Sequence, residues 1–191
     1  MIKSFLRLIG KDEEKIKENN RALVFTKWIN DKLRSKGQEE INSIQDLTNG
    51  VKLITLIELI WGETNLKFHN NPKSYQEKKE NFQIILDFLR IKRKISIPDY
   101  PLQNIVKNKD TTSLLKILWN IIYNHTVKWI TIYGVNGENA LLQWCSKFRS
   151  TPITNFTDDW KDGKLLCEIL NFYYPNSIDT SILDLKLILE Q

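Results

Sequence analysis

Glycine, proline, cysteine and histidine are all scarce in this sequence of 191 residues, which holds 7 Gly, 5 Pro, 2 Cys and 2 His. So few turn-forming residues disfavour a sheet protein with many short connections and favour helices. The cysteines, Cys145 and Cys167, and the two histidines follow no metal-ligand or redox spacing. No Gly-rich phosphate loop or His-Glu-x-x-His motif occurs, and no histidine is placed to activate a cysteine. We therefore expect no enzyme activity, no cofactor and no metal site.

A secretory signal is also missing, because the apolar run in the N-terminal stretch MIKSFLRLIG is too broken to form one. Together with the low cysteine content, this predicts a reducing, intracellular setting.

Apolar residues are plentiful, at 41% of the chain with six tryptophans, which is enough to build a core. The most apolar stretch is residues 111–127, TTSLLKILWNIIYNHTV. It lacks Gly and Pro and is too long for a typical strand, so it is predicted to be a helix with an N-cap near Asp110. It is too short and too interrupted to span a bilayer. A helix that is apolar on almost all sides is normally central to a core, so we predict an all-α fold around it.

Helical periodicity also marks the segments that precede this central helix. Residues 2–9 are spaced for a short amphipathic helix that Gly10 would end, either a strap docked on the domain or a membrane or partner contact. A long helix is predicted over residues 14–35, with a buried stripe of Phe25, Trp28, Ile29 and Leu33. Further helices are predicted at residues 47–61 and 75–90, followed by an extended connector at 95–101 and a short apolar turn at 102–106.

Charge is unevenly spread along the chain. Residues 1–136 hold 23 Lys+Arg and 15 Asp+Glu, a net charge of +8, and residues 137–191 hold 5 and 8, a net charge of −3. The first part is therefore the one that an acidic partner would attract. Charge alone does not distinguish nucleic acid, anionic lipid and an acidic protein filament.

The chain repeats itself after residue 137. The segment around Trp144 is similar to the one around Trp28, 116 positions earlier, and the segment around Gly163 is similar to the one around Gly50, 113 positions earlier. Each copy has an acid, an apolar residue, a variable residue, Asp or Asn, and then Gly before an apolar helix. Glycine permits a tight backbone turn and the acid caps the helix, so the repeated residues are those that such a turn requires.

These segments resemble known sequences. FTKW (25–28), DLTNGVKLI (46–54), Glu80-Asn81 and LWNII (118–122) are similar to a calponin homology domain. The string TPITNFTDDWKDGKLL (151–166) is similar to the start of the second calponin homology domain of filamins, more than to spectrin or α-actinin. The resemblance implies a calponin homology fold with a first domain at 18–129, an extension at 1–17, a linker at 130–136 and an incomplete second domain at 137–191. A complete second copy would need roughly fifty more residues, by comparison with the first.

The resemblance implies that the chain binds F-actin through three segments. The residues that it assigns to the first helix are Leu23, Thr26, Lys27, Asn30 and Arg34. Those assigned to the central helix are Leu115, Lys116, Leu118, Ile122 and His125. Those assigned to the start of the second domain are Gln143, Lys147 and Arg149. The alternative for each set is a solvated helix face or, for the leucines and isoleucines, the core.

Lys116 departs from the family, which usually has a small residue there. The chain could therefore be a signalling or scaffold adaptor without actin binding, in which Lys116 blocks docking. A microtubule-binding calponin homology protein is a second rival, although such proteins normally have a single copy.

Other features have interpretations that compete with function. Trp28, Trp119, Trp144 and Trp160 are expected to anchor the core. The basic cluster at residues 90–94 could bind nucleic acid or an anionic phosphoinositide lipid, or be solvated. No aromatic residue is interleaved with it and no nucleic-acid-binding signature accompanies it, so we expect no nucleic acid partner. Asp158, Asp159 and Asp162 are expected to cap a helix rather than bind a cation.

We therefore predict a cytoplasmic, actin-cytoskeletal binding module of the filamin-like tandem type. The apolar residues of the second copy, and a C-terminal apolar segment at residues 182–189, predict self-association by exchange with a second chain.

Overall fold

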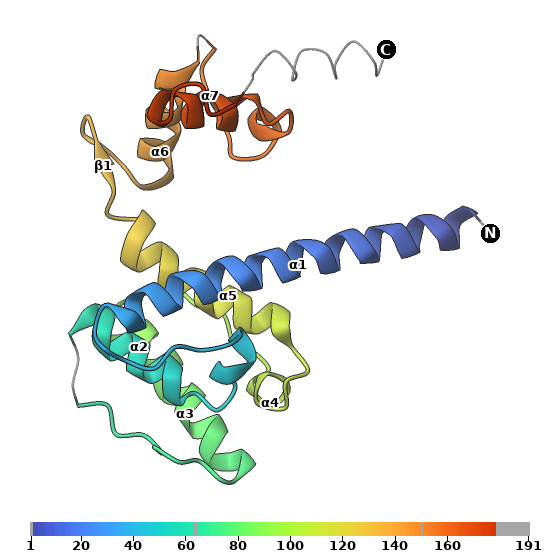
Figure 1. The fold of residues 1–191 in the computed structure, drawn as a ribbon. Coiled ribbons are helices and arrows are strands. Elements are labelled where there is room, and N and C mark those ends of the chain that lie inside the picture. Colours follow the sequence, from blue (N-terminus) through green and yellow to red (C-terminus); the bar gives the residue numbers. More distant parts are fainter. Residues whose placement is uncertain (1, 63–64, 150, 179–191) are drawn as a thin grey trace. The chain divides into compact units, whose positions relative to one another are not determined.

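The computed structural model describes the backbone of residues 2–62, 65–149 and 151–178, and the side chains from residue 14 onward within these ranges. The chain divides into two compact units, residues 1–125 and 126–191. Helices dominate each unit, which confirms the all-α prediction (Figure 1). The apolar segment predicted at residues 182–189 lies outside the described residues. No helix in the described part of the chain is long and apolar enough to cross a membrane.

The first unit begins with a long helix, α1 (Ile2–Arg34). The prediction that Gly10 ends a first short helix is wrong. A glycine inside a helix costs only about 1 kcal/mol relative to alanine, and the lysines and glutamates that follow favour the helix. The apolar face predicted for residues 2–9 lies outside the described side chains. α1 packs on α2 (Val51–Trp61) and α5 (Thr111–Ile122), and its N-terminal half extends beyond them (Figure 1).

The turn before α2 begins with one turn of 3-10 helix, η1 (Ile44–Leu47). α2 starts at Val51, later than predicted, because Gly50 adopts a left-handed conformation with φ 81° and ψ −17°. The Asp46 carboxylate accepts two backbone N–H groups at the start of this turn, at 2.7 and 3.2 Å. The Asn49 side chain accepts the N–H of Val51 at 2.9 Å. The predicted roles of the acid and the glycine are confirmed here.

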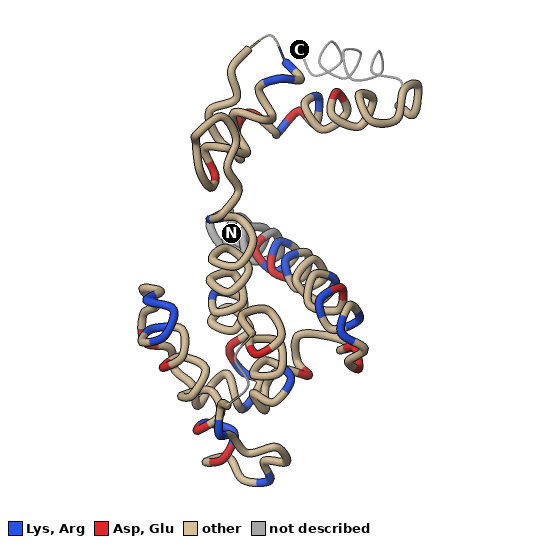
Figure 2. Tube along the Cα trace, turned by 90° about the vertical axis from the view of Figure 1, so that its left-hand side faces the viewer, with Lys and Arg blue, Asp and Glu red and all other residues tan. Residues whose placement is uncertain are grey.

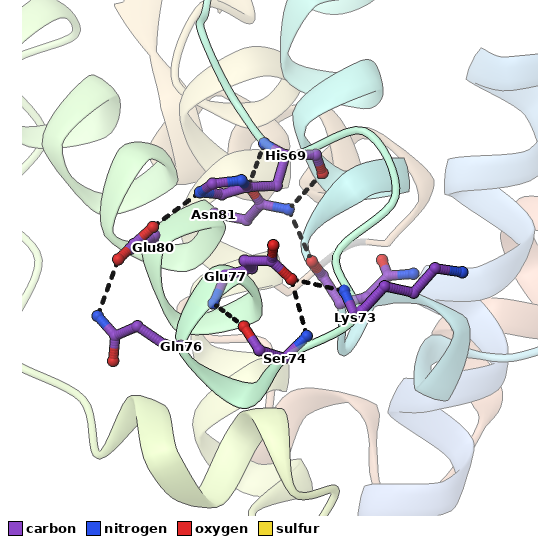
Figure 3. Close-up of polar contacts among 8 residues, drawn as sticks. His69, Lys73, Ser74, Gln76, Glu77, Glu80 and Asn81 are labelled. Carbon is purple, nitrogen blue, oxygen red and sulfur yellow. Dashed lines mark hydrogen bonds and ion pairs between the residues drawn. The ribbon is translucent and has the colours of Figure 1, made fainter.

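A buried asparagine fastens α3 (Tyr75–Asp87) to this turn and to the loop before α3 (Figure 3). The Asn81 side chain is fully buried. Its amide nitrogen donates to the carbonyl oxygens of Asn49 and His69, both at 3.0 Å, and its oxygen accepts the His69 N–H at 2.9 Å. All three hydrogen bonds compensate for removing the amide from water.

The start of α3 is closed by a reciprocal cap, also drawn in Figure 3. Ser74 Oγ accepts the backbone N–H of Glu77 at 3.1 Å. The Glu77 carboxylate accepts the backbone N–H groups of Ser74 and Lys73 at 2.7 and 2.6 Å. These hydrogen bonds, led by that from Ser74, lower the pKa of Glu77. A capping box of this kind fixes where the helix begins.

Three elements link α3 to the central helix. The π-helical turn η2 (Phe88–Lys92) continues α3, an extended stretch at residues 95–101 follows, and α4 (Leu102–Val106) comes next. α5 is capped by Asp110, whose side chain accepts the Ser113 N–H at 2.9 Å. It continues into the π-helical turn η3 (Tyr123–Val127), so the helix predicted over residues 111–127 is confirmed. α5 contributes Leu114, Leu115, Ile117, Leu118, Ile121 and Ile122 to the core of this unit.

The second unit starts with a small hairpin where the sequence predicted a plain linker. β1 (Thr131–Ile132) pairs antiparallel with β2 (Val135–Asn136). Tyr133 and Gly134 between them have φ of 49° and 77°, as a two-residue hairpin turn requires. α6 (Gly137–Cys145), η4 (Ser146–Phe148), η5 (Asp158–Trp160) and α7 (Lys164–Tyr173) follow. The buried residues of this unit include Cys145, Ile153, Leu165 and Ile169.

The two units share details that reveal the internal repeat in three dimensions. Gly163, with φ 71°, precedes α7 as Gly50 precedes α2. The Asp159 carboxylate accepts two backbone N–H groups at 2.7 and 3.1 Å, the role of Asp46 in the first unit. The Asp162 side chain accepts the backbone N–H two residues later at 3.0 Å, the role of Asn49. The second unit therefore builds the same turn. The capping role predicted for Asp159 and Asp162 is confirmed, whereas the Asp158 carboxylate pairs with Lys161 at 2.6 Å.

Candidate functional site

The first predicted segment is a solvent-facing side of α1. Leu23 is 70% exposed and Lys27 is also exposed, whereas Phe25 between them is buried. Val24 and Ile16, at 64% and 58%, add apolar surface to the exposed side of the helix. Exposed aliphatic side chains beside a lysine are suited to a contact that combines apolar burial with charge.

The other three residues of this segment are more buried than Leu23 and Lys27 or are engaged in contacts within the chain. Thr26 is half-buried. The Asn30 side chain is engaged with the backbone of Ile41, donating to its oxygen at 2.8 Å and accepting its N–H at 2.9 Å. Arg34 makes two hydrogen bonds of 2.9 Å to Glu40, and these raise the pKa of Arg34. Asn30 therefore anchors a loop, and a partner of Arg34 would compete with Glu40.

The second predicted segment is mostly core. Leu115, Leu118 and Ile122 are 5%, 0% and 8% exposed, so their side chains do not face solvent. Lys116 is exposed. The structure thus favours the core alternative for the three aliphatic residues and leaves Lys116 available to a partner.

Trp119 contradicts the prediction that it anchors the core. Its side chain is 45% exposed, one turn after Lys116 on the same side of α5. One face stacks on Phe25 of α1, with ring centroids 6.3 Å apart and planes at 12°. The packing of α1 over α5 decides this exposure, because α5 is apolar on nearly all sides and one of them has to face out.

A groove between α1 and α5 brings this tryptophan together with charged side chains of both signs. A hydrogen bond of 2.6 Å from the Thr112 hydroxyl to Glu18 joins its walls. Acidic and basic residues also alternate along α1 (Figure 2). The groove is lined by Glu14, Lys15, Lys17, Glu18, Arg21, Phe25, Tyr100, Thr112, Leu115, Lys116, Trp119 and Asn120.

His125, at the end of the second segment, lies between two tryptophans. Its ring meets Trp28 edge-on at 6.0 Å and Trp61 edge-on at 6.1 Å. Burial, and then the positive charges of Lys32 and Arg93, lower the pKa of His125. The neutral imidazole is therefore part of the packing between η3, α1 and α2.

The third predicted segment lies in the second unit and is largely occupied by internal contacts. Gln143 is exposed. The Lys147 ammonium donates to the Tyr133 hydroxyl at 2.8 Å and lies 4.5 Å from the centre of that ring. Arg149 is paired with Asp162 at 3.3 Å and Glu168 at 3.2 Å, with 18% of its side chain exposed. Gln143 is thus the least constrained of the three.

Comparison with known proteins identifies the fold. Residues 19–126 and 136–187 match the calponin homology (CH) domain family. The chain belongs to the calponin homology family. This match covers both units of the structure, and the left-handed glycine before α2 and α7 is common to both calponin homology segments.

Curated relatives of this calponin homology chain include α-actinins. It is 27% identical over 172 residues to α-actinin-like protein 1 of Schizosaccharomyces pombe, covering 85% of this chain and 27% of that protein. It is 30% identical over 166 residues to human α-actinin-3, covering 85% of this chain and 18% of that protein. Human α-actinin-1 is 29% identical over the same length. The chain thus spans about a quarter or less of the length of these relatives.

The groove of the first calponin homology segment was not predicted from the sequence. A signal for it was present, because Thr112, Lys116 and Trp119 fall on one side of a helix that is otherwise mostly apolar. The other half of the groove comes from α1, and only the tertiary structure brings the two helices together. No cluster of potential metal ligands occurs within the described residues.

Proposed function

We propose that this chain is an F-actin-binding module of the cytoskeleton with two calponin homology segments. The observation that carries the proposal is that Leu23 and Lys27 of α1 are exposed, as are Lys116 and Trp119 of α5. Both sets lie in the part of the chain with a net charge of +8. The similarity to α-actinins supports the same partner.

Binding would combine an electrostatic approach with apolar burial. Positive charge on the first unit steers an acidic filament towards it. Exposed charge pairs are worth only about 0–1 kcal/mol each, so several must act together. Leu23 and Trp119 supply apolar area that charge pairs alone do not provide. Binding should therefore weaken as salt rises, since the Debye length falls to about 8 Å at physiological salt.

We further propose that this module is of the filamin tandem type and that it is located at the cytoplasmic actin cytoskeleton. The string at residues 151–166 supports the filamin type, whereas the relatives named above are α-actinins. We propose in addition that the second unit mediates self-association, because Phe172, Tyr173 and Tyr174 are exposed at the end of α7.

Co-sedimentation with F-actin, with microtubules in parallel, tests the proposal. We expect the chain to pellet with actin in a salt-dependent way and not with microtubules. Lys27→Glu should weaken actin binding about fivefold, because it turns an attraction into a repulsion. Lys161→Glu is the control, since Lys161 lies in the acidic part of the chain. Equal losses in both variants, or no pelleting at low salt, would contradict actin binding.

Lys116→Ala separates actin binding from the adaptor alternative. If Lys116 contributes to the positive surface, its removal should weaken pelleting by up to about fivefold. If it blocks docking, as the adaptor interpretation requires, the same change should create or strengthen pelleting. Lys109→Ala removes an exposed lysine outside both candidate helices and controls for net charge.

A further inference from the structure

One turn of the first unit places an isolated isoleucine among cations. Ile91 is 70% exposed on the π-helical turn η2 and is followed by Lys92, Arg93 and Lys94, all exposed. The two residues before this stretch of the turn, Phe88 and Leu89, are 3% and 0% exposed. The turn is therefore held by its buried side while its other side offers one large apolar side chain to solvent. We name residues 90–94 the Ile91 turn.

The Ile91 turn is held in place by its own hydrogen bonds. The backbone N–H of Ile95 donates to Leu89 at 2.9 Å, and Lys94 between them has a left-handed φ of 54°. The Arg90 side chain donates to the carbonyl oxygens of Ile97 and Pro98, at 3.1 and 2.8 Å. It also pairs with Asp99 at 2.7 Å. A surface ordered before binding loses less conformational entropy when a partner arrives.

The cations that follow Ile91 have no acidic partner in the described part of the chain. The ion pairs among the described residues of the first unit involve basic residues other than these three, and within the turn it is Arg90 that has a carboxylate beside it. Arg93 lies 5.2 Å from the centre of the Trp61 ring, which packs on Phe88 at 5.7 Å. An indole beneath an arginine keeps the guanidinium at the surface, where it is free to meet an anion.

We propose that the Ile91 turn docks on the surface of an anionic lipid bilayer, with Ile91 inserted among the lipids and the cations on the headgroups. Charge complementarity selects an anionic surface. The small apolar area of the turn favours a membrane over a protein as the partner. A specific protein interface buries about 1,000 Å² or more, whereas the apolar part of this turn is one side chain. A bilayer needs only such a point of insertion, with lysine and arginine chains reaching up to the phosphates.

Vesicle co-sedimentation of the full chain tests this proposal. We compare neutral phosphatidylcholine vesicles with vesicles that contain phosphatidylserine, or a phosphoinositide at the same total negative charge. We expect binding to both anionic vesicles and none to neutral ones. Ile91→Asn should lower the partition coefficient at least about tenfold, because the buried apolar area is lost. Lys92→Gln with Lys94→Gln should lower it about 25-fold, about fivefold for each charge.

Matched variants make the result specific to the turn. Ile16→Asn removes another isoleucine, 58% exposed, and Lys36→Gln with Lys109→Gln removes two other exposed lysines. We expect each control to lose less than threefold, and all variants to keep the melting temperature of the wild type. Binding that is insensitive to Ile91→Asn, equal losses in the controls, or no binding to anionic vesicles would overturn the proposal. Actin pelleting by Ile91→Asn should stay unchanged, so the two functions fail independently.

Discussion

A Cβ atom placed on Gly50 would lie 2.7 Å from the Cβ atom of Asn81. Real side chains do not approach so closely, so the helix that carries Asn81 requires a glycine at this point. The left-handed backbone of Gly50 requires one independently. Its counterpart in the repeat, Gly163, shares the left-handed φ but has open space around the same position. Comparing substitutions at Gly50 and Gly163 therefore separates the free-energy cost of backbone strain from the cost of crowding.

Gly50→Ala should destabilise the first unit by about 2–5 kcal/mol. The left-handed backbone costs about 1–2 kcal/mol for a residue with a Cβ, and crowding against Asn81 adds about 1–3 kcal/mol. Gly163→Ala should cost the second unit about 1–2 kcal/mol, the backbone part alone. Amide exchange resolved by residue, with thermal unfolding, measures each unit separately. Equal losses in the two units would show that Asn81 does not constrain Gly50.

The stability of the first unit should fall as the pH drops from 7.5 to 5.5. The pKa of His125 is lowered in the fold, first by burial and then by Lys32 and Arg93. The unfolded chain therefore binds this proton at a higher pH than the folded chain. The stability that neutral His125 contributes is fully present above its pKa in the unfolded chain, about 6.5. It is lost as the pH falls towards the pKa of His125 in the folded chain.

His125→Phe should reduce this loss, because phenylalanine preserves ring packing between Trp28 and Trp61 without taking up a proton. The measurement is the melting temperature at several pH values between 7.5 and 5.5. Glu77 and Asp159 titrate below this window, since their pKa values are lowered from ordinary carboxylate values. His69→Gln controls for the other histidine, and this variant should still lose stability between pH 7.5 and 5.5. An unchanged pH profile in His125→Phe would contradict the assignment.

Self-association of the second unit should depend on the exposed apolar surface of α7. Leu166 is 50% exposed, whereas its counterpart in the repeat, Leu53, is fully buried. Phe172, further along the same helix, is 66% exposed. Fully burying side chains of this size is worth about 1.5–3 kcal/mol each, which favours a partner surface.

Size-exclusion chromatography with light scattering tests this prediction. We expect the mean mass to rise with protein concentration, and the double change Leu166→Lys with Phe172→Lys to abolish the rise. Ile16→Lys alters an exposed apolar residue of the first unit and should leave association intact. A mass that stays monomeric at all concentrations would rule out self-association under those conditions.

The helical class, the central helix and the repeat could all be predicted from the order of the amino acids. The stretch at residues 111–127 has no residue that would break a helix and nearly no polar face, so its place in the core followed from burial alone. Gly50 and Gly163 could be paired in advance because the turn chemistry is local. An acid, a small polar residue and a glycine close it within six residues of chain, whatever packs around them.

The exposed side of the central helix could not be predicted, because it depends on how the other helices pack on it. Leu118 and Trp119 are adjacent and both apolar, yet one is fully buried and the other is 45% exposed. The sequence also did not reveal that Asn30 is engaged with the backbone of Ile41. Periodicity reports how apolar each side of a helix is, but the neighbouring helices determine which side they cover. That choice depends on contacts between residues far apart in the chain, and these place Trp119 in the groove beside α1.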